Sequence, residues 1–351
     1  MGLHSSDPAT VYLSAGVRMR DPSTDAVERA LYDERTVLRL HGFRNTLWVM
    51  TKAMASAMFW STSINLAATQ TKRLVGLVEA NDVTTDADGW VVDAKATLLA
   101  ELETRGTATT RQLGAVMPEV AVPLTLQGAT VSAHTRLMTC LAFDGSIVRT
   151  RPQGTWISSQ YVWAPMESWI DGGLEEVAPD IAARVILAAY LRSFGPVTFT
   201  DITWWTGWTV AVARRALGTL ATVTVDTDDG EAFILDGDDE RGNGQPWVAL
   251  LPGLDPTTMG WKRRDWYLEP SRTELLFDRN GNAGPTIWMD GRVVGGWVQA
   301  NDGEIRLAVL DPEANSRMDE IEAEAERVLT LFGEVRHRPR FPTPAVTELY
   351  D

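Results

Sequence analysis

The chain has 351 residues, of which 44% are hydrophobic and 23% charged, so composition favours two to four folded domains and argues against disorder. No apolar run reaches about 18 residues and no charged-then-apolar leader opens the chain, which excludes a membrane span and a secretory signal from our expectations. The single cysteine, Cys140, excludes an intrachain disulfide and a cysteine-built zinc site, and the four scattered histidines form no metal-binding pattern. We expect no metal.

The formal net charge of −15 argues against nucleic acid as a partner, because phosphate contacts need Lys and Arg. The positions of the charged residues matter more than the net charge, however. Acidic residues crowd two stretches, 226–240 (which includes Asp239 and Glu240) and 319–326. Arginines gather elsewhere, on the expected third helices and hairpins of two repeated segments.

The first segments read as two helices and a hairpin. Asp7-Pro8 is an N-cap followed by proline at the first helical position, which predicts a helix to about Met19, and another helix follows at 25–34. Residues 37–50 are β-branched and aromatic around a Gly and an Asn, as in a β-hairpin. A longer helical region is expected over 52–82.

Two later stretches, 92–161 and 179–236, repeat one plan of three short helices followed by a two-stranded hairpin. That order is typical of a winged helix, a variant of the helix-turn-helix that binds DNA. The first stretch has expected helices at 92–105, 110–117 and 131–143 and strands at 147–151 and 155–161. The second has expected helices at 179–194, after Thr200 and at 208–220, and a hairpin at 222–236.

Beyond residue 246 the pattern changes to strands, in WVALLP, TELLF, TIWMDGRVVGGWVQ and IRLAVL, with one helix at 316–331. We therefore predict an α+β protein with a separate β-rich C-terminal domain. The expected domains are a first winged helix without its leading helix plus linking helices (1–90), a second winged helix (91–172), a third (173–245) and the β-rich domain (246–351).

Arginines on the repeated units are candidates for DNA contacts. Arg136 lies on the third helix of the second unit, and Arg149 and Arg151 lie on its hairpin. Arg214 and Arg215 repeat the theme on the third helix of the next unit. The alternative is a solvated charged face, the usual environment of surface arginine.

The residues His4-Ser5-Ser6-Asp7 come directly before the first helix, where free backbone N–H groups attract anions. A histidine beside hydroxyls and a carboxylate could position a water molecule or a nucleobase edge, which makes His4, Ser6 and Asp7 candidate catalytic residues. The alternative is a capping segment with no chemistry.

The chain resembles the AlkZ-like DNA glycosylase family of tandem winged-helix proteins. The matching stretches are GLHSSDPATVYLS, RLHGFRNTLWVM, DGSIVRTRPQGTWISSQYVWAP, ALLPGLDPTTMGWKRRDW and MDGRVVGGWV, spread through almost the whole chain. The resemblance implies three winged helices and a C-terminal β-barrel around a basic DNA channel. It also implies excision of alkylated purines, in some members unhooking of interstrand crosslinks, and no cofactor.

Two motifs depart from the family pattern. Characterised members carry Gln-aliphatic-Gln or Gln-aliphatic-Asp just before the Asp-Pro, where this chain has His4, Ser5 and Ser6. A neutral His4 could accept a proton from water as a base, whereas an uncharged Ser6 stabilises a sugar cation poorly. The family's Arg-Gly-Thr-Leu-His appears here with Arg44 and Thr46 kept, and we assign both to DNA binding.

The sequence thus predicts a monomeric, cytoplasmic protein that binds double-stranded DNA, alkylated or crosslinked, and associates with the nucleoid when bound. Its predicted activity is monofunctional hydrolysis of the N-glycosidic bond. Two alternatives stay open: a non-catalytic DNA-binding or regulatory protein, and an interaction protein that no longer binds DNA.

The first unit lacks one helix of the expected three. That helix would cover an apolar face formed by Val11, Tyr12, Val17, Val27 and Leu31, and leaving the face bare would expose a patch uncommon on a soluble monomer. We therefore expect that Met1 is not the natural start of the protein.

Overall fold

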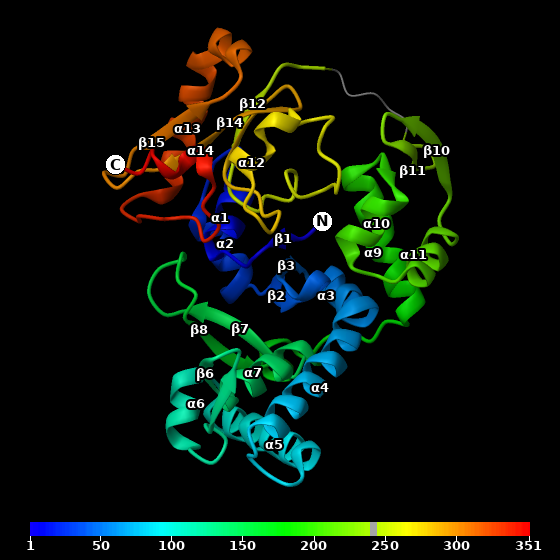
Figure 1. Ribbon diagram of the computed structural model, residues 1–351, viewed down its shortest axis with the longest axis vertical. Coiled ribbons are helices and arrows are strands. Elements are labelled where there is room, and N and C mark those ends of the chain that lie inside the picture. The colour runs from blue at the N-terminus through cyan, green and yellow to red at the C-terminus, as the bar shows by residue number, and fades with distance from the viewer. Residues whose placement is uncertain (239–243) are drawn as a thin grey trace. The chain divides into compact units, whose positions relative to one another are not determined.

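The computed structural model describes residues 1–238 and 244–351 (Figure 1). Asp239 and Glu240 of the predicted acidic stretch lie outside the described residues. The chain divides into two compact units: unit 1 holds residues 1–29, 155–157 and 187–351, and unit 2 holds residues 30–154 and 158–186. Two of the four unit boundaries fall within the helical turn Arg29–Asp33 and within helix α9 (Pro179–Phe194), and the other two enclose residues 155–157.

Unit 2 alternates helices with short antiparallel strands. Its helices are α3 (Lys52–Met58), α4 (Ile64–Ala80), α5 (Ala87–Arg105), α6 (Thr110–Val116), α7 (Ala133–Phe143) and α8 (Met166–Trp169), with helical turns at Phe43–Asn45 and Phe59–Ser63. Its strands are β2 (Val37–His41), β3 (Leu47–Thr51), β4 (Ala108–Thr109), β5 (Pro123–Leu126), β6 (Ala129–Ser132), β7 (Ile147–Pro152) and β8 (Tyr161–Pro165). The strands pair as β2 with β3, β5 with β6, and in the order β4-β8-β7.

Local signals fix the helix ends in unit 2. Gly106, at φ +71°, ends α5 in a backbone conformation that favours glycine. Thr109 and Gln112 form a reciprocal capping box that starts α6. The core then packs α4, α5, α6 and α7 together through fully buried side chains such as Leu98 and Leu137.

Unit 1 contains the two ends of the chain. Its helices are α1 (Pro8–Gly16), α2 (Thr24–Glu28), the later half of α9, α10 (Phe199–Thr206), α11 (Val210–Leu217), α12 (Thr273–Leu276), α13 (Met318–Phe332) and α14 (Pro344–Thr347), with helical turns at Pro270–Arg272 and Pro312–Arg317. Its strands are β1 (Leu3–His4), β9 (Val197–Thr198), β10 (Thr222–Thr227), β11 (Gly230–Leu235), β12 (Val248–Leu251), β13 (Thr286–Met289), β14 (Arg292–Gln299) and β15 (Ile305–Val309).

The C-terminal strands of unit 1 form one antiparallel sheet in the order β12-β13-β14-β15. The pairing of Ile287 with Gly295 and of Trp288 with Val293 leaves Val294 as one extra residue, which marks a β-bulge in β14. The sheet is open, with β12 and β15 as its edges, and we find no closed barrel among the described residues. The protein is a mixed α+β fold, as predicted, whereas the division into four domains stays a prediction.

Several expectations about local structure were wrong. TELLF is not a strand, since Thr273–Leu276 is the helix α12, and a segment this short shows no periodicity that separates strand from helix. The expected strand at 155–161 is wrong, because the second strand of this hairpin is β8, Tyr161–Pro165. The sequence also did not predict the hairpin β5–β6, after which α7 begins at Ala133. The apolar face expected to be bare is not, because Val11, Tyr12, Val27 and Leu31 are buried and Val17 is half-buried.

Candidate functional site

The segment that precedes α1 adopts the predicted cap. Asp7 accepts a hydrogen bond from the Ala9 N–H at 3.1 Å through Oδ1, and Pro8 occupies the first helical position. His4 Nδ1 accepts the Ser6 N–H at 3.3 Å. His4 and Asp7 are 7% and 4% exposed, so the three candidate catalytic residues lie in one short, largely buried segment at a helix N-terminus.

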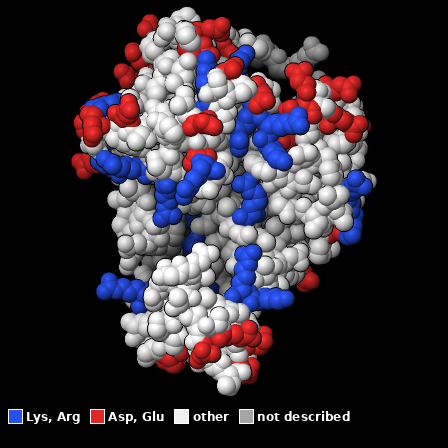
Figure 2. Space-filling model, in the orientation of Figure 1, with Lys and Arg blue, Asp and Glu red and all other residues white. Residues whose placement is uncertain are grey.

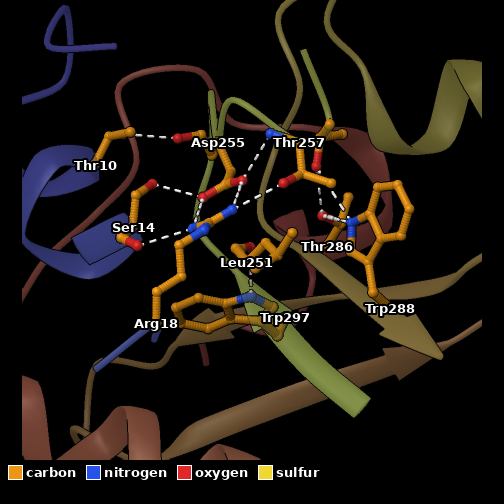
Figure 3. A network of polar contacts seen from close by, with 11 residues as sticks. Thr10, Ser14, Arg18, Leu251, Asp255, Thr257, Thr286, Trp288 and Trp297 are labelled. Carbon is orange, nitrogen blue, oxygen red and sulfur yellow. Dashed lines mark hydrogen bonds and ion pairs between the residues drawn. The ribbon is translucent and has the colours of Figure 1, made fainter. Parts of the chain in front are cut away.

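One side of α1 is tied to the loop that follows β12 (Figure 3). Thr10 donates from Oγ1 to the Gly253 carbonyl at 2.6 Å, and Ser14 donates from Oγ to Asp255 at 2.6 Å. Arg18 completes the row with two hydrogen bonds to Asp255, at 2.7 and 2.8 Å. Residues spaced by four share one side of a helix. The contacts of Thr10, Ser14 and Arg18 therefore fix which side of α1 faces the loop after β12.

The Asp7 carboxylate has a second set of partners on the opposite oxygen. Oδ2 accepts the Arg340 N–H at 3.0 Å and lies 3.3 Å from His337 Nε2. Burial by itself would raise the pKa of Asp7, but the hydrogen bond and charge of His337 and the amides of Arg340 and Ala9 outweigh it and hold the pKa below its usual value. Asp7 is therefore an ionised carboxylate at neutral pH.

The hairpin arginines of unit 2 lie against aromatic rings. The Arg149 guanidinium is 5.5 Å from the ring centre of Tyr161 and 4.9 Å from that of Trp163. The Arg151 guanidinium lies 4.9 Å from the Tyr32 ring and pairs with Asp33 at 3.1 Å. Arg149 is half-buried, while Arg151 is exposed at the surface of the hairpin β7–β8.

The turn between β2 and β3 holds the candidates Arg44 and Thr46. Arg44 is exposed and adopts φ 54°, in the left-handed region. The Thr46 hydroxyl donates to the Phe43 carbonyl at 2.8 Å, so it closes the turn. Arg136 on α7 is half-buried at the rim of a groove of about 430 Å³, which it shares with Arg73 of α4.

Arg214 and Arg215 belong to unit 1 and are exposed on α11. The hairpin β10–β11 that follows is acidic, and acidic side chains gather over it on the face drawn in Figure 2. Its carboxylates include Asp226, Asp228, Asp229 and Glu231. These carboxylates would repel the phosphate groups of DNA, which distinguishes this hairpin from the arginine-bearing hairpin β7–β8.

The structure brings the candidate catalytic residues together in unit 1, and places five of the DNA-binding candidates in unit 2 (Arg44, Thr46, Arg136, Arg149 and Arg151). Sequence reasoning missed His337, Arg340, Arg18 and Asp255, whose partners are hundreds of residues away. The signal that remains for them in the sequence is weak, since single charged residues in loops are common. In the described parts of the chain, no cluster of three or more His, Cys, Asp or Glu side chains is arranged to hold a metal ion.

A family model described as DNA glycosylase AlkZ-like matches residues 1–331. The chain is similar to the solved structure of Streptomyces sahachiroi DNA glycosylase AlkZ, with a TM-score of 0.72 and 19% sequence identity over 94% of this chain and 89% of that chain. At this identity the likeness concerns the fold. No curated protein matches the chain, and no helix in the described residues is both long and apolar enough to cross a membrane.

Proposed function

Because the chain belongs to the AlkZ-like DNA glycosylase family, we propose that it is a monofunctional DNA glycosylase that releases alkylated purines from duplex DNA or unhooks crosslinks. The observation that carries this proposal is the ionised, buried Asp7 beside His4 and Ser6 at the N-terminus of α1. An anchored carboxylate can stabilise a developing sugar cation, and polar side chains beside it can orient a water molecule, as hydrolysis of an N-glycosidic bond would need.

The proposed reaction is attack of water on the anomeric carbon. The N-glycosidic bond breaks and its electron pair leaves with the purine, which is a good leaving group because alkylation has made it cationic. The protein then needs to orient the water, stabilise the sugar cation and accept one proton. Asp7 supplies the negative charge that stabilises the cation and the oxygen that accepts the proton.

For His4 we propose a role other than that of a base. Since Nδ1 accepts the Ser6 N–H, a neutral His4 carries its proton on Nε2. In this tautomer the outer edge of the ring is a hydrogen-bond donor. We therefore assign His4 to orienting the water, and Ser6 to contacting it, rather than assigning His4 to removing the proton.

DNA binding is proposed for the repeated helix-helix-helix-hairpin segments, which we interpret as winged helices. In unit 2, the helices α5, α6 and α7 precede the pair β7–β8, in the order that the sequence predicted. We assign phosphate contacts to Arg136, Arg149 and Arg151, with Arg44 at the β2–β3 turn. Arg214 and Arg215 of α11 are assigned the same role in unit 1.

A second function is favoured by one observation. His4 and Asp7 are almost fully buried and both carboxylate oxygens of Asp7 already accept hydrogen bonds, as in a purely structural cap. A non-catalytic DNA-binding protein would keep this arrangement. It would bind duplex DNA with a steep salt dependence and release no base.

The test is release of free N3- or N7-alkylpurine from methylated duplex DNA, followed by mass spectrometry, with the abasic strand checked for the absence of cleavage. The proposal expects release by the wild type and loss of release in the His4→Ala, Ser6→Ala double variant. Duplex binding without release would favour the non-catalytic function. Release that persists in the double variant would refute the assignment of His4 and Ser6.

A further inference from the structure

Residues 337–340, near the C-terminus, contact the candidate catalytic segment His4–Asp7. His337 Nε2 lies 3.3 Å from Asp7 Oδ2, and the Arg340 N–H donates to the same oxygen at 3.0 Å. The Arg340 side chain adds a hydrogen bond from Nη1 to the Ser6 carbonyl at 2.9 Å. The side chains of Asp7 and His337 are 6% and 11% exposed, so this contact is shielded from water.

The holding segment is itself fixed to the sheet. The backbone N–H of His337 donates to Gln299 Oε1 at 2.9 Å, and Gln299 Nε2 donates to the Val335 carbonyl at 3.1 Å. Gln299 is 3% exposed and belongs to β14, a central strand of the four-stranded sheet. His337 thus reaches Asp7 from a backbone that the sheet holds in place.

This contact lies partly outside the family match. The family model ends at residue 331, whereas His337 and Arg340 follow it. The residues that hold the N-terminal segment are therefore supplied by the last 20 residues of the chain, for which the family comparison gives no assignment.

We propose that His337 and Arg340 are positioning residues that fix the conformation of His4–Asp7. His337 donates from Nε2 to Asp7 Oδ2 and so fixes the orientation of the Asp7 carboxylate. The Arg340 side chain donates to the Ser6 carbonyl and so fixes the backbone there. The consequence for catalysis rests on the proposed glycosylase function, but the structural role does not. A carboxylate held by a donor on a rigid support is oriented before the substrate arrives, and this preorganisation is what a positioning residue contributes.

Four variants of the full-length protein test the proposal. His337→Ala removes the donor, and His337→Gln restores an N–H at nearly the same position. Arg340→Ala removes the bond to Ser6. Arg338→Ala is the matched control, because Arg338 lies in the same segment with the same charge but contacts Asn301 at 2.6 Å and the Tyr350 ring at 4.9 Å.

The direct readout is hydrogen exchange of the amides of residues 5–10, measured by mass spectrometry. Loss of the shielded His337–Asp7 contact predicts exchange that is at least about five-fold faster in His337→Ala. Loss of the more exposed hydrogen bond to the Ser6 carbonyl predicts a smaller increase in Arg340→Ala, which still exceeds that in Arg338→Ala. We expect wild-type exchange in Arg338→Ala and nearly wild-type exchange in His337→Gln. Peptides from α4 and α5 of unit 2 report whether the rest of the fold is intact.

Unchanged exchange in His337→Ala would overturn the proposal, and so would exchange in His337→Gln as fast as in His337→Ala. If His337→Ala fails to fold, Arg340→Ala against Arg338→Ala decides the question. The second readout is single-turnover base release, where His337→Ala is expected to be slower by about ten-fold or more with unchanged duplex affinity. A wild type without release would refute the proposed function alone, since the exchange result stands independently.

Discussion

Arg18 and Asp255 form a two-pronged ion pair in which the carboxylate is fully buried while the guanidinium side chain is 41% exposed. Asp255 also accepts the Ser14 hydroxyl and the Thr257 N–H, so its charge is compensated by four hydrogen bonds (Figure 3). Without these partners, the buried charge of the carboxylate would be uncompensated and would destabilise the fold. The pair therefore locks α1, and with it the candidate catalytic segment, to the loop after β12.

The Asp255→Asn variant keeps the side chain's volume and removes its charge. We expect a loss of roughly 2–4 kcal/mol in the free energy of unfolding, because Arg18 loses its counter-charge and Ser14 its acceptor. Urea unfolding measures this loss. Asp302→Asn, which breaks the exposed Arg306–Asp302 pair, is the control and should have a much smaller effect. Equal losses in the two variants would show that burial of Asp255 does not matter.

His41 predicts an acid-sensitive step in stability. Burial, and then the charge of Arg149, lower the pKa of His41 to about 3, and its ring stacks on Phe143 at 4.2 Å. The unfolded chain protonates this residue near its ordinary value of 6.5. Between these values the unfolded state binds more protons, so stability that is present above pH 6.5 is lost as the pH falls.

Urea unfolding at pH 7.5 and pH 5.0 tests this expectation. The wild type should lose roughly 1–2 kcal/mol more between the two values than His41→Gln, which cannot be protonated. The same pH dependence in both proteins would contradict a His41 that stays neutral in the folded state.

The hairpin arginines test the proposed DNA surface. Replacing Arg149 and Arg151 with Ala should weaken binding of unrelated duplexes to a similar degree and lower the slope of log K against log[salt] by about one for each lost contact. Arg105→Ala is the matched control, because Arg105 pairs with Glu101 on α5 of the same unit. Loss confined to one duplex sequence would instead indicate base recognition.

Two glycines should respond to alanine in opposite ways. A Cβ at Gly295 would lie 2.2 Å from the Ala308 carbonyl of the neighbouring strand, so Gly295→Ala should cost more than about 2 kcal/mol of stability. A Cβ at Gly76, inside α4, would meet nothing within 4 Å, and Gly76→Ala should be neutral or stabilise by up to about 1 kcal/mol. Thermal unfolding of the two variants checks this contrast.

The sequence was informative where the cause of the structure is local. The cap of Asp7-Pro8, the stop at Gly106 and the hairpin 222–236 follow from one or a few neighbouring residues, and the structure has each of them. Periodicity failed where a segment is too short to distinguish helix from strand, as at Thr273–Leu276.

The contacts that anchor the candidate site were beyond local reasoning. Arg18 and Asp255 are 237 positions apart, and Asp7 and Arg340 are 333 apart. A lone arginine or histidine in a loop has no pattern that names its partner, because the partner is chosen by tertiary packing. Composition misled in the same way: the charge of −15 includes an acidic hairpin, whereas β7–β8 carries Arg149 and Arg151.

The most direct measurement of the central claim is the single-turnover rate of alkylpurine release by Asp7→Asn. Asn keeps the cap acceptor for Ala9 and removes the charge, so we predict a rate at least about 100-fold lower with duplex affinity unchanged within about two-fold. Asp201→Asn is the matched control, another buried carboxylate in the first turn of a helix, and should keep the wild-type rate. Release by Asp7→Asn at the wild-type rate would contradict the account.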